Sequence, residues 1–228
     1  MSCLCCAGES VEVEQVPHSP ATEEQPIPVL RLNESSEAQI KGYSATAEPT
    51  PIFNVKLEKT AQDTPIGLYL DISDGTMLHV CGMRLGTNPA QTYNQSVPSH
   101  LQIKDGDFIT KVNGVTGNAN QLVDALTKTT SLEIEIQRPV TFSVKVNKKG
   151  SGMGLDVNYA MQGMSLVVEG LHEGAIKVWN DAHPLAQVQR GDRIVAVDGI
   201  TGSATDLLTK LAEERELELL CSRPVGRQ

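Results

Sequence analysis

The feature that most constrains the fold of this chain is an internal repeat. Residues 106–139 align with residues 191–224 at a constant offset of 85 without a gap, and 14 of these 34 positions are identical. Upstream, residues 53–57, 67–68 and 78–83 match residues 142–146, 154–155 and 166–171 at slightly different offsets. Such self-similarity is typical of a chain that uses one structural unit twice. We therefore expect two copies of a small domain in the 228 residues.

Each copy is predicted to be mainly β-strand. Apolar and polar residues alternate at 53–57 and 142–146, which is the period of a half-buried strand. Further strands are predicted at 66–70, 78–83, 108–112 and 132–136, and at 153–157, 166–171, 193–197 and 217–221. The pairs Asn113-Gly114 and Asp198-Gly199 favour a turn with positive φ.

Each copy also carries one strong helix signal. Asn118 with Gln121, and Ser203 with Asp206, are spaced like a helix N-cap and its partner. Apolar residues then recur at helical spacing: Ala119, Leu122, Val123 and Leu126 in the first copy, and Ala204, Leu207, Leu208 and Leu211 in the second. The predicted class is therefore α+β.

The N-terminal segment has a different composition. Residues 1–51 contain eight Glu, no Asp and two basic residues, so −6 of the net charge of −9 lies there, together with six of the twelve prolines. Such a segment cannot bury enough apolar surface to offset the entropy of ordering, so we predict a disordered acidic tail. The rest has a net charge of only −3 and no basic excess, so nucleic acid is not an expected partner.

The two copies resemble the PDZ domain. The matching residues are the apolar-Gly-apolar triplets Ile66-Gly67-Leu68 and Met153-Gly154-Leu155, and the Gly-Asp-x-Ile runs that begin at Gly106 and Gly191. The resemblance covers about residues 52–224. It implies two PDZ-like partly open β-barrels or sandwiches at 52–139 and 140–224, each with a capped helix beside its second strand. A short C-terminal tail would follow at 225–228.

The resemblance implies a binding function. A PDZ domain takes an extended or C-terminal peptide as an added strand between its second strand and its helix, and loop N–H groups hold the carboxylate. The residues expected to bind peptide are Ile66, Gly67, Leu68, Tyr69, Leu70, Ala119, Leu122, Val123 and Leu126, and Lys149, Met153, Gly154, Leu155, Asp156, Val157, Ala204, Leu207, Leu208 and Leu211.

Two departures from the family pattern refine this expectation. Ala119 and Ala204 stand where many PDZ domains have a histidine that contacts a ligand Ser or Thr, so an apolar ligand preference is expected. A basic residue before the loop often assists carboxylate binding. Lys148 and Lys149 offer it in the second copy, whereas Lys59 is expected to stand further from its loop, so the second copy is expected to be the better site.

These features predict a scaffold or adaptor protein. The alternatives are a structural or self-associating tandem repeat with no free peptide site, and a regulatory subunit of an enzyme. Catalysis, cofactors and metal ions are not expected, because the five histidines have no metal-ligand spacing and lie in no nucleophile motif. They are His18, His79, His100, His172 and His183.

The N-terminal cysteines suggest a route to a membrane. No apolar run approaches the roughly 20 residues of a membrane-spanning helix, and no secretory signal is present, so a cytoplasmic location is expected. Cys3, Cys5 and Cys6 could be S-acylated and hold the chain peripherally at a membrane's cytoplasmic face, the alternatives being free thiols or adventitious metal binding. Cys81 and Cys221 lie in strand-like runs and are expected to be buried.

Overall fold

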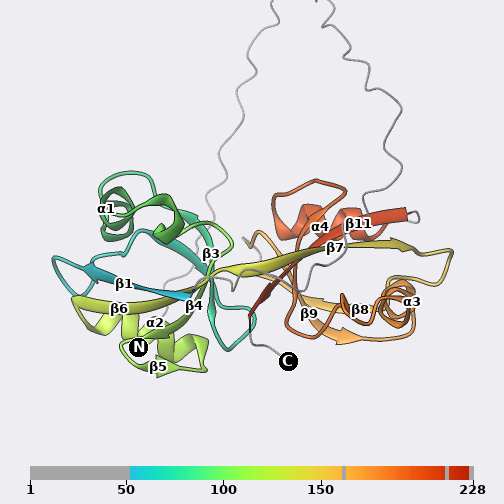
Figure 1. Ribbon diagram of the computed structural model, residues 1–228, viewed down its shortest axis with the longest axis horizontal. Helices are drawn as coiled ribbons and strands as arrows, with labels where there is room; N and C mark the ends of the chain where they lie inside the picture. Colours follow the sequence, from blue (N-terminus) through green and yellow to red (C-terminus); the bar gives the residue numbers. More distant parts are fainter. Residues whose placement is uncertain (1–51, 161–162, 214–215, 226–228) are drawn as a thin grey trace, which may run out of the picture. The chain divides into compact units, whose positions relative to one another are not determined.

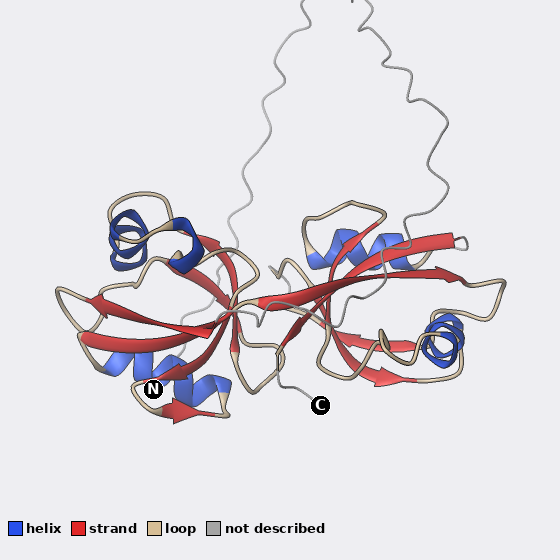
Figure 2. Ribbon diagram, viewed as in Figure 1, coloured by secondary structure: helices blue, strands red, loops and turns tan. Residues whose placement is uncertain are grey.

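The computed structural model describes residues 52–160, 163–213 and 216–225. The predicted tail at 1–51, its cysteines Cys3, Cys5 and Cys6, and residues 226–228 lie outside the described residues. The described part is α+β and contains two antiparallel sheets, each with its own helices (Figures 1 and 2). We call residues 52–138 lobe 1 and residues 139–225 lobe 2. No helix in these described ranges is long and apolar enough to cross a membrane.

Lobe 1 is built on the strand order β1-β6-β4-β3-β2, with β5 paired to β4. Its elements are β1 (Ile52–Glu58), β2 (Leu68–Asp71), β3 (Leu78–Met83), α1 (Pro89–Ser96), the 3-10 turn η1 (Ser99–Leu101), β4 (Phe108–Val112), β5 (Val115–Thr116), α2 (Ala119–Lys128) and β6 (Ser131–Gln137).

Lobe 2 repeats this order as β7-β11-β10-β9-β8. Its elements are β7 (Pro139–Asn147), β8 (Leu155–Asn158), β9 (Leu166–Leu171), α3 (Ala175–Ala182), β10 (Arg193–Val197), α4 (Ala204–Leu211) and β11 (Glu216–Pro224). Strands β3 and β9 have the bounds that the sequence predicts, whereas β11 is longer. Arg138 alone separates β6 from β7.

The core of each lobe follows from the alternation seen in the sequence. In β1 every second side chain is buried, and Phe53, Val55 and Leu57 enter the first hydrophobic cluster. In β7, Phe142 and Val144 enter the second cluster in the same way. Full burial of one such side chain contributes about 1.5–3 kcal/mol, so these strands are fixed with their apolar face inward.

The identities shared by the two copies include an ion pair. Arg138 lies 3.7 Å from the buried Asp107, and its counterpart Arg223 lies 2.6 Å from the buried Asp192. Each guanidinium also lies over the ring of a phenylalanine in the first strand of its lobe: Arg138 over Phe53, and Arg223 over Phe142. The Asp of each Gly-Asp dipeptide and the Arg of each Arg-Pro dipeptide form this ion pair. The pair links the start of β4 to the end of β6 in lobe 1, and the start of β10 to the end of β11 in lobe 2.

The turns and caps are those that the sequence indicates. Asn113 and Asp198 both have positive φ, as do the glycines that follow them. The Asn118 side chain accepts a hydrogen bond from the Gln121 backbone N–H. Ser203 accepts one from the Asp206 backbone N–H at the start of α4.

Helices α1 and α3 are not predicted by the sequence analysis. The signal for α1 is nevertheless present, because Asn88 is followed by Pro89: the Asn88 side chain caps the helix and proline occupies its first turn. For α3 the N-cap is Gly174, which offers no side-chain acceptor, so no comparable signal marks its start.

The two lobes belong to one compact unit of the chain and are joined by a buried ion pair. Arg193 of β10 donates to the Asp71 carboxylate at 2.7 Å and to the Ser165 hydroxyl at 2.9 Å. The side chains of Arg193 and Asp71 are almost wholly excluded from solvent. A second contact joins the lobes where the Gln137 side chain donates to the Val225 carbonyl.

Candidate functional site: two edge-strand grooves

The second strand of each lobe lies at the open edge of its sheet. Among the described strands, β2 pairs only with β3, and β8 pairs only with β9. Both pairs have the same register and a bulge at the same place, between Tyr69 and Leu70 and between Asp156 and Val157. An edge strand presents unpaired backbone N–H and C=O groups to its surroundings. Each lobe therefore offers one strand to which an extended chain can add.

The loop before each edge strand uses its carbonyls within the fold and leaves amides without an acceptor. The Gly67 carbonyl accepts from the Arg84 amide at 2.8 Å, and the Ile66 carbonyl accepts from the Ala90 amide at 2.9 Å. In lobe 2 the Gly154 carbonyl accepts from the His172 amide. Within the described residues, the amides of Ile66, Gly67 and Gly154 donate no hydrogen bond. Successive unpaired amides of this kind can hold an anion.

Glycine is required in both loops. Gly67 has φ +94° and Gly154 has φ +75°. A Cβ at Gly67 would lie 1.9 Å from the side-chain oxygen of Asn88, and a Cβ at Gly154 would lie 2.8 Å from the His172 carbonyl oxygen. The chain thus needs glycine for the left-handed backbone and for the close approach of the neighbouring turn.

In lobe 1 a cavity of about 200 Å³ lies between the start of β2 and α2. Its lining includes five apolar residues that the sequence analysis assigns to peptide binding: Ile66, Leu68, Leu70, Val123 and Leu126. Lys59 and Arg84 add two basic groups. Asp63 also lines the cavity, so the two basic groups stand beside one acidic group. The cavity has the size and lining of a pocket for one apolar side chain.

Lys59 is closer to this cavity than the sequence analysis predicts. Its ammonium donates to the Leu126 carbonyl at 2.8 Å and to the Gln62 carbonyl, so it is held between the loop and the end of α2. Lys148 follows β7 as Lys59 follows β1, and both are buried, whereas Lys149 is exposed. Of the two lysines that the sequence offers, Lys148 and Lys149, only Lys148 is buried in the way that Lys59 is. Lys148 is the structural counterpart of Lys59.

Four of the predicted groove residues are almost completely buried in the core. Ala119, Leu122, Ala204 and Leu207 are at most 2% exposed. Helical spacing places them on the same face as the groove residues, but the sheet covers them completely. Val123 in α2 and Leu208 in α4 are half-buried and pack at the margin of their clusters, so they form the accessible helix wall.

Lobe 2 has hydrophobic residues at the corresponding positions of its edge strand and helix, but they are less deeply buried. Met153, Leu155, Val157 and Leu208 are all half-buried hydrophobic residues packed against the second cluster. In lobe 1 the matching Ile66 and Leu68 are each only 8% exposed. Lobe 2 therefore offers a shallower apolar strip.

The outer faces of the two edge strands carry different side-chain pairs. The Arg84 guanidinium lies 5.1 Å from the centre of the exposed Tyr69 ring. At the equivalent positions of lobe 2, the His172 ring nitrogen lies 2.5 Å from an Asp156 carboxylate oxygen. Residues that project from this face of an edge strand meet alternate side chains of an added strand. Arg84 and His172 are residues that the sequence analysis does not assign to the site.

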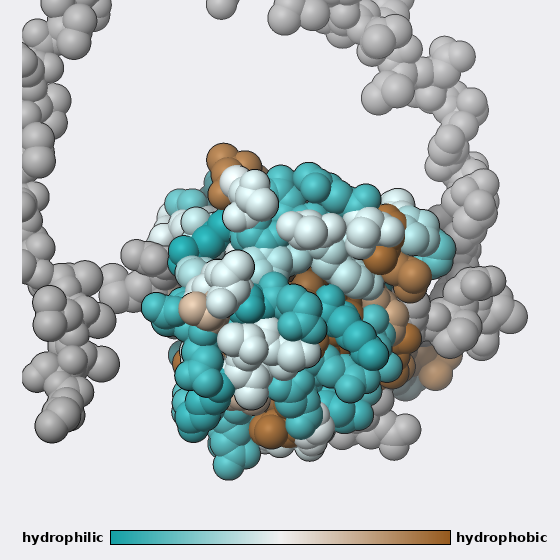
Figure 3. All heavy atoms as spheres, turned by 90° about the vertical axis from the view of Figure 1, so that its left-hand side faces the viewer, coloured by the Kyte–Doolittle hydropathy of each residue, from teal (hydrophilic) through white to brown (hydrophobic). Residues whose placement is uncertain are grey.

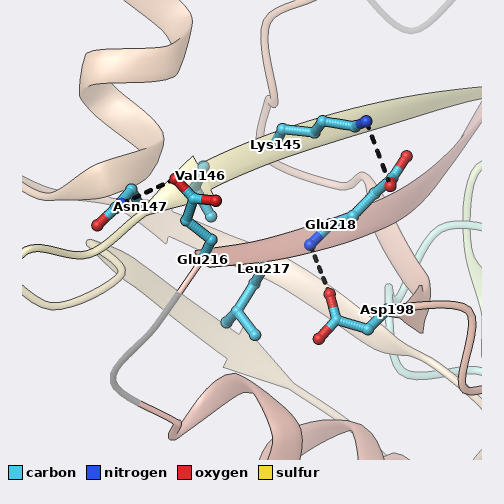
Figure 4. Close-up of a pocket in the computed structure, with 7 residues that line it drawn as sticks. All are labelled: Lys145, Val146, Asn147, Asp198, Glu216, Leu217 and Glu218. Carbon is cyan, nitrogen blue, oxygen red and sulfur yellow. Dashed lines mark hydrogen bonds and ion pairs between the residues drawn. The ribbon is translucent and has the colours of Figure 1, made fainter.

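Another hollow, of about 410 Å³, lies over β7 and β11 of lobe 2 (Figure 4). Its polar groups pair with one another: Lys145 with Glu218 at 3.5 Å, Asn147 with Glu216 at 3.0 Å, and the Glu218 amide with Asp198 at 2.8 Å. Because these groups satisfy each other, the hollow is a weaker candidate than the edge-strand grooves.

The visible face of lobe 1 is mostly hydrophilic, with small separate apolar patches (Figure 3).

Three titratable groups, one from β2 and two from β3, meet at the end of β2 in an unusual environment. Burial, and then the nearby Arg193, lower the pKa of His79 to about 3. Burial and then Asp71 raise the pKa of the Cys81 thiol. Burial also raises the pKa of the Asp71 carboxyl, but Arg193 and the hydrogen bonds from Ser73 outweigh it and keep that pKa below its usual value. At neutral pH this cluster therefore holds a neutral imidazole, a thiol and a carboxylate.

Comparisons with known proteins add little to this geometry. No protein-family model and no curated protein matches the chain. A solved structure described as INAD PDZ45 in complex with NG2 peptide is 17% identical over 78% of this chain and 91% of that chain, with a TM-score of 0.32. A second, described as the complex of INAD PDZ45 and NORPA CC-PBM, is 16% identical over 78% and 93%, with a TM-score of 0.33. Both TM-scores are low, so the site is interpreted from the chain's own residues.

Proposed function

We propose that the chain is a tandem PDZ-like adaptor that takes extended or C-terminal peptides at the open edges of β2 and β8. In this proposal each lobe is a partly open β-barrel with one peptide site. The observation that carries it is the lobe 1 groove: an edge strand, two loop amides without acceptors, a buried lysine and an apolar cavity meet at one place. No reaction is part of the proposed function.

Main-chain pairing would supply much of the affinity. A peptide added to β2 exchanges backbone hydrogen bonds with the strand's unpaired edge. Successive side chains of a strand point to opposite faces, so every second ligand side chain would face the cavity beside Leu68 and Leu70. The ligand side chains between them would lie beside Tyr69, which is 53% exposed.

The peptide's terminal carboxylate would lie at the loop before the edge strand. The Ile66 and Gly67 amides would donate to its oxygens, and hydrogen bonds to an ionised group are roughly twice as strong as neutral ones. Lys59 adds a positive charge from a buried position, where solvent screens it weakly. Its two carbonyl partners hold the ammonium in place before the ligand arrives.

The helix wall favours an apolar ligand. Ala119 and Ala204 open α2 and α4, are buried and carry no polar side-chain atom, so neither can hydrogen-bond a ligand hydroxyl. Val123 and Leu126 line the lobe 1 cavity instead. An aliphatic last side chain fits this lining best, because each buried CH₂ contributes about 0.8 kcal/mol.

A library of C-terminal peptides offered to the full chain tests the proposed function. We expect saturable binding of peptides with an aliphatic last residue, and at least tenfold weaker binding once the terminal carboxylate is amidated. Lys59→Met should weaken lobe 1 binding, whereas Lys56→Met, at an exposed lysine of the preceding strand β1, should not. Equal affinity for the amidated peptide would refute recognition of the terminal carboxylate, and no binding of any peptide would refute the adaptor. Concentration-dependent self-association without peptide binding would favour the self-associating alternative.

Two features would make such an adaptor effective. Two grooves in one compact unit could engage a dimeric partner together and raise its apparent affinity about 100-fold or more. S-acylation of Cys3, Cys5 and Cys6, which lie outside the described residues, would place both grooves at the cytoplasmic face of a membrane. Mass spectrometry of the native N-terminal peptide tests the acylation, and an unmodified peptide would exclude it.

A further inference from the structure

A second potential site lies at the other end of β2. Asp71, the last residue of this strand, pairs in register with His79 of β3, and Cys81 follows His79 by two residues. Alternation along β3 therefore places His79 and Cys81 on one face, and Asp71 reaches the same face from β2. One ligand atom from each of the three residues lies within 4.8 Å of the others. The Cys81 sulfur is 3.7 Å from Nδ1 of His79.

The imidazole of this cluster has one ring nitrogen beside the Cys81 sulfur, Nδ1, and a second one, Nε2, that is unsatisfied. His79 is 3% exposed, and its Nε2 has no hydrogen-bond partner within the described residues. A buried polar group without a partner costs about 1–3 kcal/mol. His79 and Cys81 both line a cavity of about 430 Å³, and Ser222, whose buried hydroxyl also has no partner within the described residues, lines the same cavity. The cavity thus gathers polar atoms that the fold itself does not use.

The ligand set suits a doubly charged cation. The Asp71 carboxylate and a Cys81 thiolate would together supply two negative charges, which balance such an ion. The Arg193 guanidinium lies 2.7 Å from the Asp71 carboxylate and 3.8 Å from that of Asp74. Asp71 already accepts from Arg193 and from the amide and hydroxyl of Ser73, and a carboxylate has about four lone-pair positions, so one remains for a metal.

We propose that Asp71, His79 and Cys81 bind a divalent cation of the Zn²⁺ class. Zn²⁺ takes carboxylate, imidazole and thiolate ligands in a tetrahedral arrangement, and a water molecule in the cavity would complete the fourth position. Ca²⁺ and Mg²⁺ suit the cluster poorly, because they require six or more ligands that are mainly oxygen. As the metal–sulfur bond forms, the Cys81 thiol releases its proton to solvent. This site is independent of the proposed peptide grooves.

Sequence spacing does not reveal this cluster. His79 and Cys81 are two residues apart, and Asp71 comes from the preceding strand, so no known metal-ligand motif is formed. The expectation of no metal site rests on that spacing. Only the β2–β3 register brings the three residues together.

Cobalt titration of the full chain tests the site. Cys3, Cys5 and Cys6 are first replaced by Ser, so that thiols outside the described residues cannot bind the metal. We expect one equivalent of Co²⁺ to bind, with a thiolate-to-cobalt charge-transfer band and release of about one proton per metal. Cys81→Ser should abolish the band. His79→Gln should weaken binding by more than the roughly 10- to 100-fold that loss of an outer-shell partner costs.

The matched control is Cys221→Ser. Cys221 is a buried thiol of β11, and burial raises its pKa to about 12. This variant should keep the band, the stoichiometry and the proton release. Absence of a charge-transfer band in the tail-substituted chain, or a band that survives Cys81→Ser, would overturn the site. Zn²⁺ should also raise the unfolding midpoint of the tail-substituted chain, and should raise it less in the Cys81→Ser variant of that chain. If Zn²⁺ leaves the midpoint of both proteins unchanged, the proposed metal site is wrong.

Discussion

Lobes 1 and 2 share one backbone plan but differ in the side chains around the ends of their edge strands. Asp71 and His79 of lobe 1 correspond in register to Asn158 and Val167 of lobe 2. Phe108 at the start of β4 corresponds to Arg193 at the start of β10. Lobe 1 therefore carries a buried acid and imidazole, and lobe 2 supplies the buried cation that pairs with the acid. The repeated unit gives both lobes the same strand order, and the residues that differ between the copies form the ion pair that joins the lobes.

Loss of the buried cation should have the largest effect. Arg193→Met leaves Asp71 buried without its ion-pair partner, which should lower the free energy of unfolding by about 4 kcal/mol. Urea unfolding followed by Trp179 fluorescence measures the change. The double variant Asp71→Leu with Arg193→Met removes both charges of the pair and should recover part of the loss, because Asp74, 3.8 Å from Arg193, still loses its contact with the guanidinium. A single-variant loss below about 1 kcal/mol would show that the pair does not join the lobes.

Replacing either loop glycine should lower the free energy of unfolding, but only at Gly67 should a second substitution restore part of the loss. Gly154→Ala brings a Cβ against backbone atoms at His172 and Glu173 and should cost about 3 kcal/mol in unfolding free energy. Gly67→Ala meets the side chain of Asn88 instead, so the Asn88→Gly background should relieve part of its cost. Urea unfolding of Gly154→Ala, Gly67→Ala, Asn88→Gly and the double variant Gly67→Ala with Asn88→Gly measures these losses. No relief in the Asn88→Gly background would contradict this difference between the two loops.

The imidazole of lobe 1 should make stability depend on pH. His79 has a folded-state pKa of about 3, whereas an unfolded histidine titrates near 6.5, so only the unfolded state takes up this proton as pH falls below 6.5. Between pH 7 and pH 5 this should remove about 2 kcal/mol of unfolding free energy. Asp71 stays ionised in this range, because its pKa is lowered.

Substitution of His79 sharpens this comparison. His79→Leu gives lobe 1 an aliphatic residue like Val167 and should flatten the dependence of unfolding free energy on pH between 5 and 7. His100→Gln, at an exposed histidine, should leave the dependence unchanged. An equal slope in His79→Leu and the unmodified chain would show that His79 does not titrate in this way.

The helix caps should give the smallest effects, and the two lobes should behave alike. Asn118→Ala and Ser203→Ala each remove a side-chain acceptor at the start of a helix, so each should cost about 1 kcal/mol. Thermal or urea unfolding measures both. Asn120→Ala, an exposed residue in the first turn of α2, is the control and should change stability by less than about 0.5 kcal/mol.

Much of the fold can be predicted from the sequence because its signals are local. The alternation in Phe53, Val55 and Leu57 predicts β1, and Asn113-Gly114 predicts the turn after β4. Prediction is weaker for the site. The helical pattern assigns both Leu122 and Val123 to the peptide groove. In the structure Leu122 is fully buried in the core, whereas Val123 is only half-buried. Accessibility depends on what packs against a helix, which its own sequence does not contain.

Sequence alone determined that this chain repeats one α+β unit, where most of its strands and the capped helices α2 and α4 lie, and where Asn113-Gly114 and Asp198-Gly199 form turns. These features depend on neighbours in the chain, on φ angles and on apolar period. The tertiary structure alone decided that Lys59 stands beside the groove, that Arg193 meets Asp71, and that Asp71, His79 and Cys81 gather at one point. Such contacts join residues from different strands or different lobes, so strand register and lobe packing, rather than local pattern, bring them together.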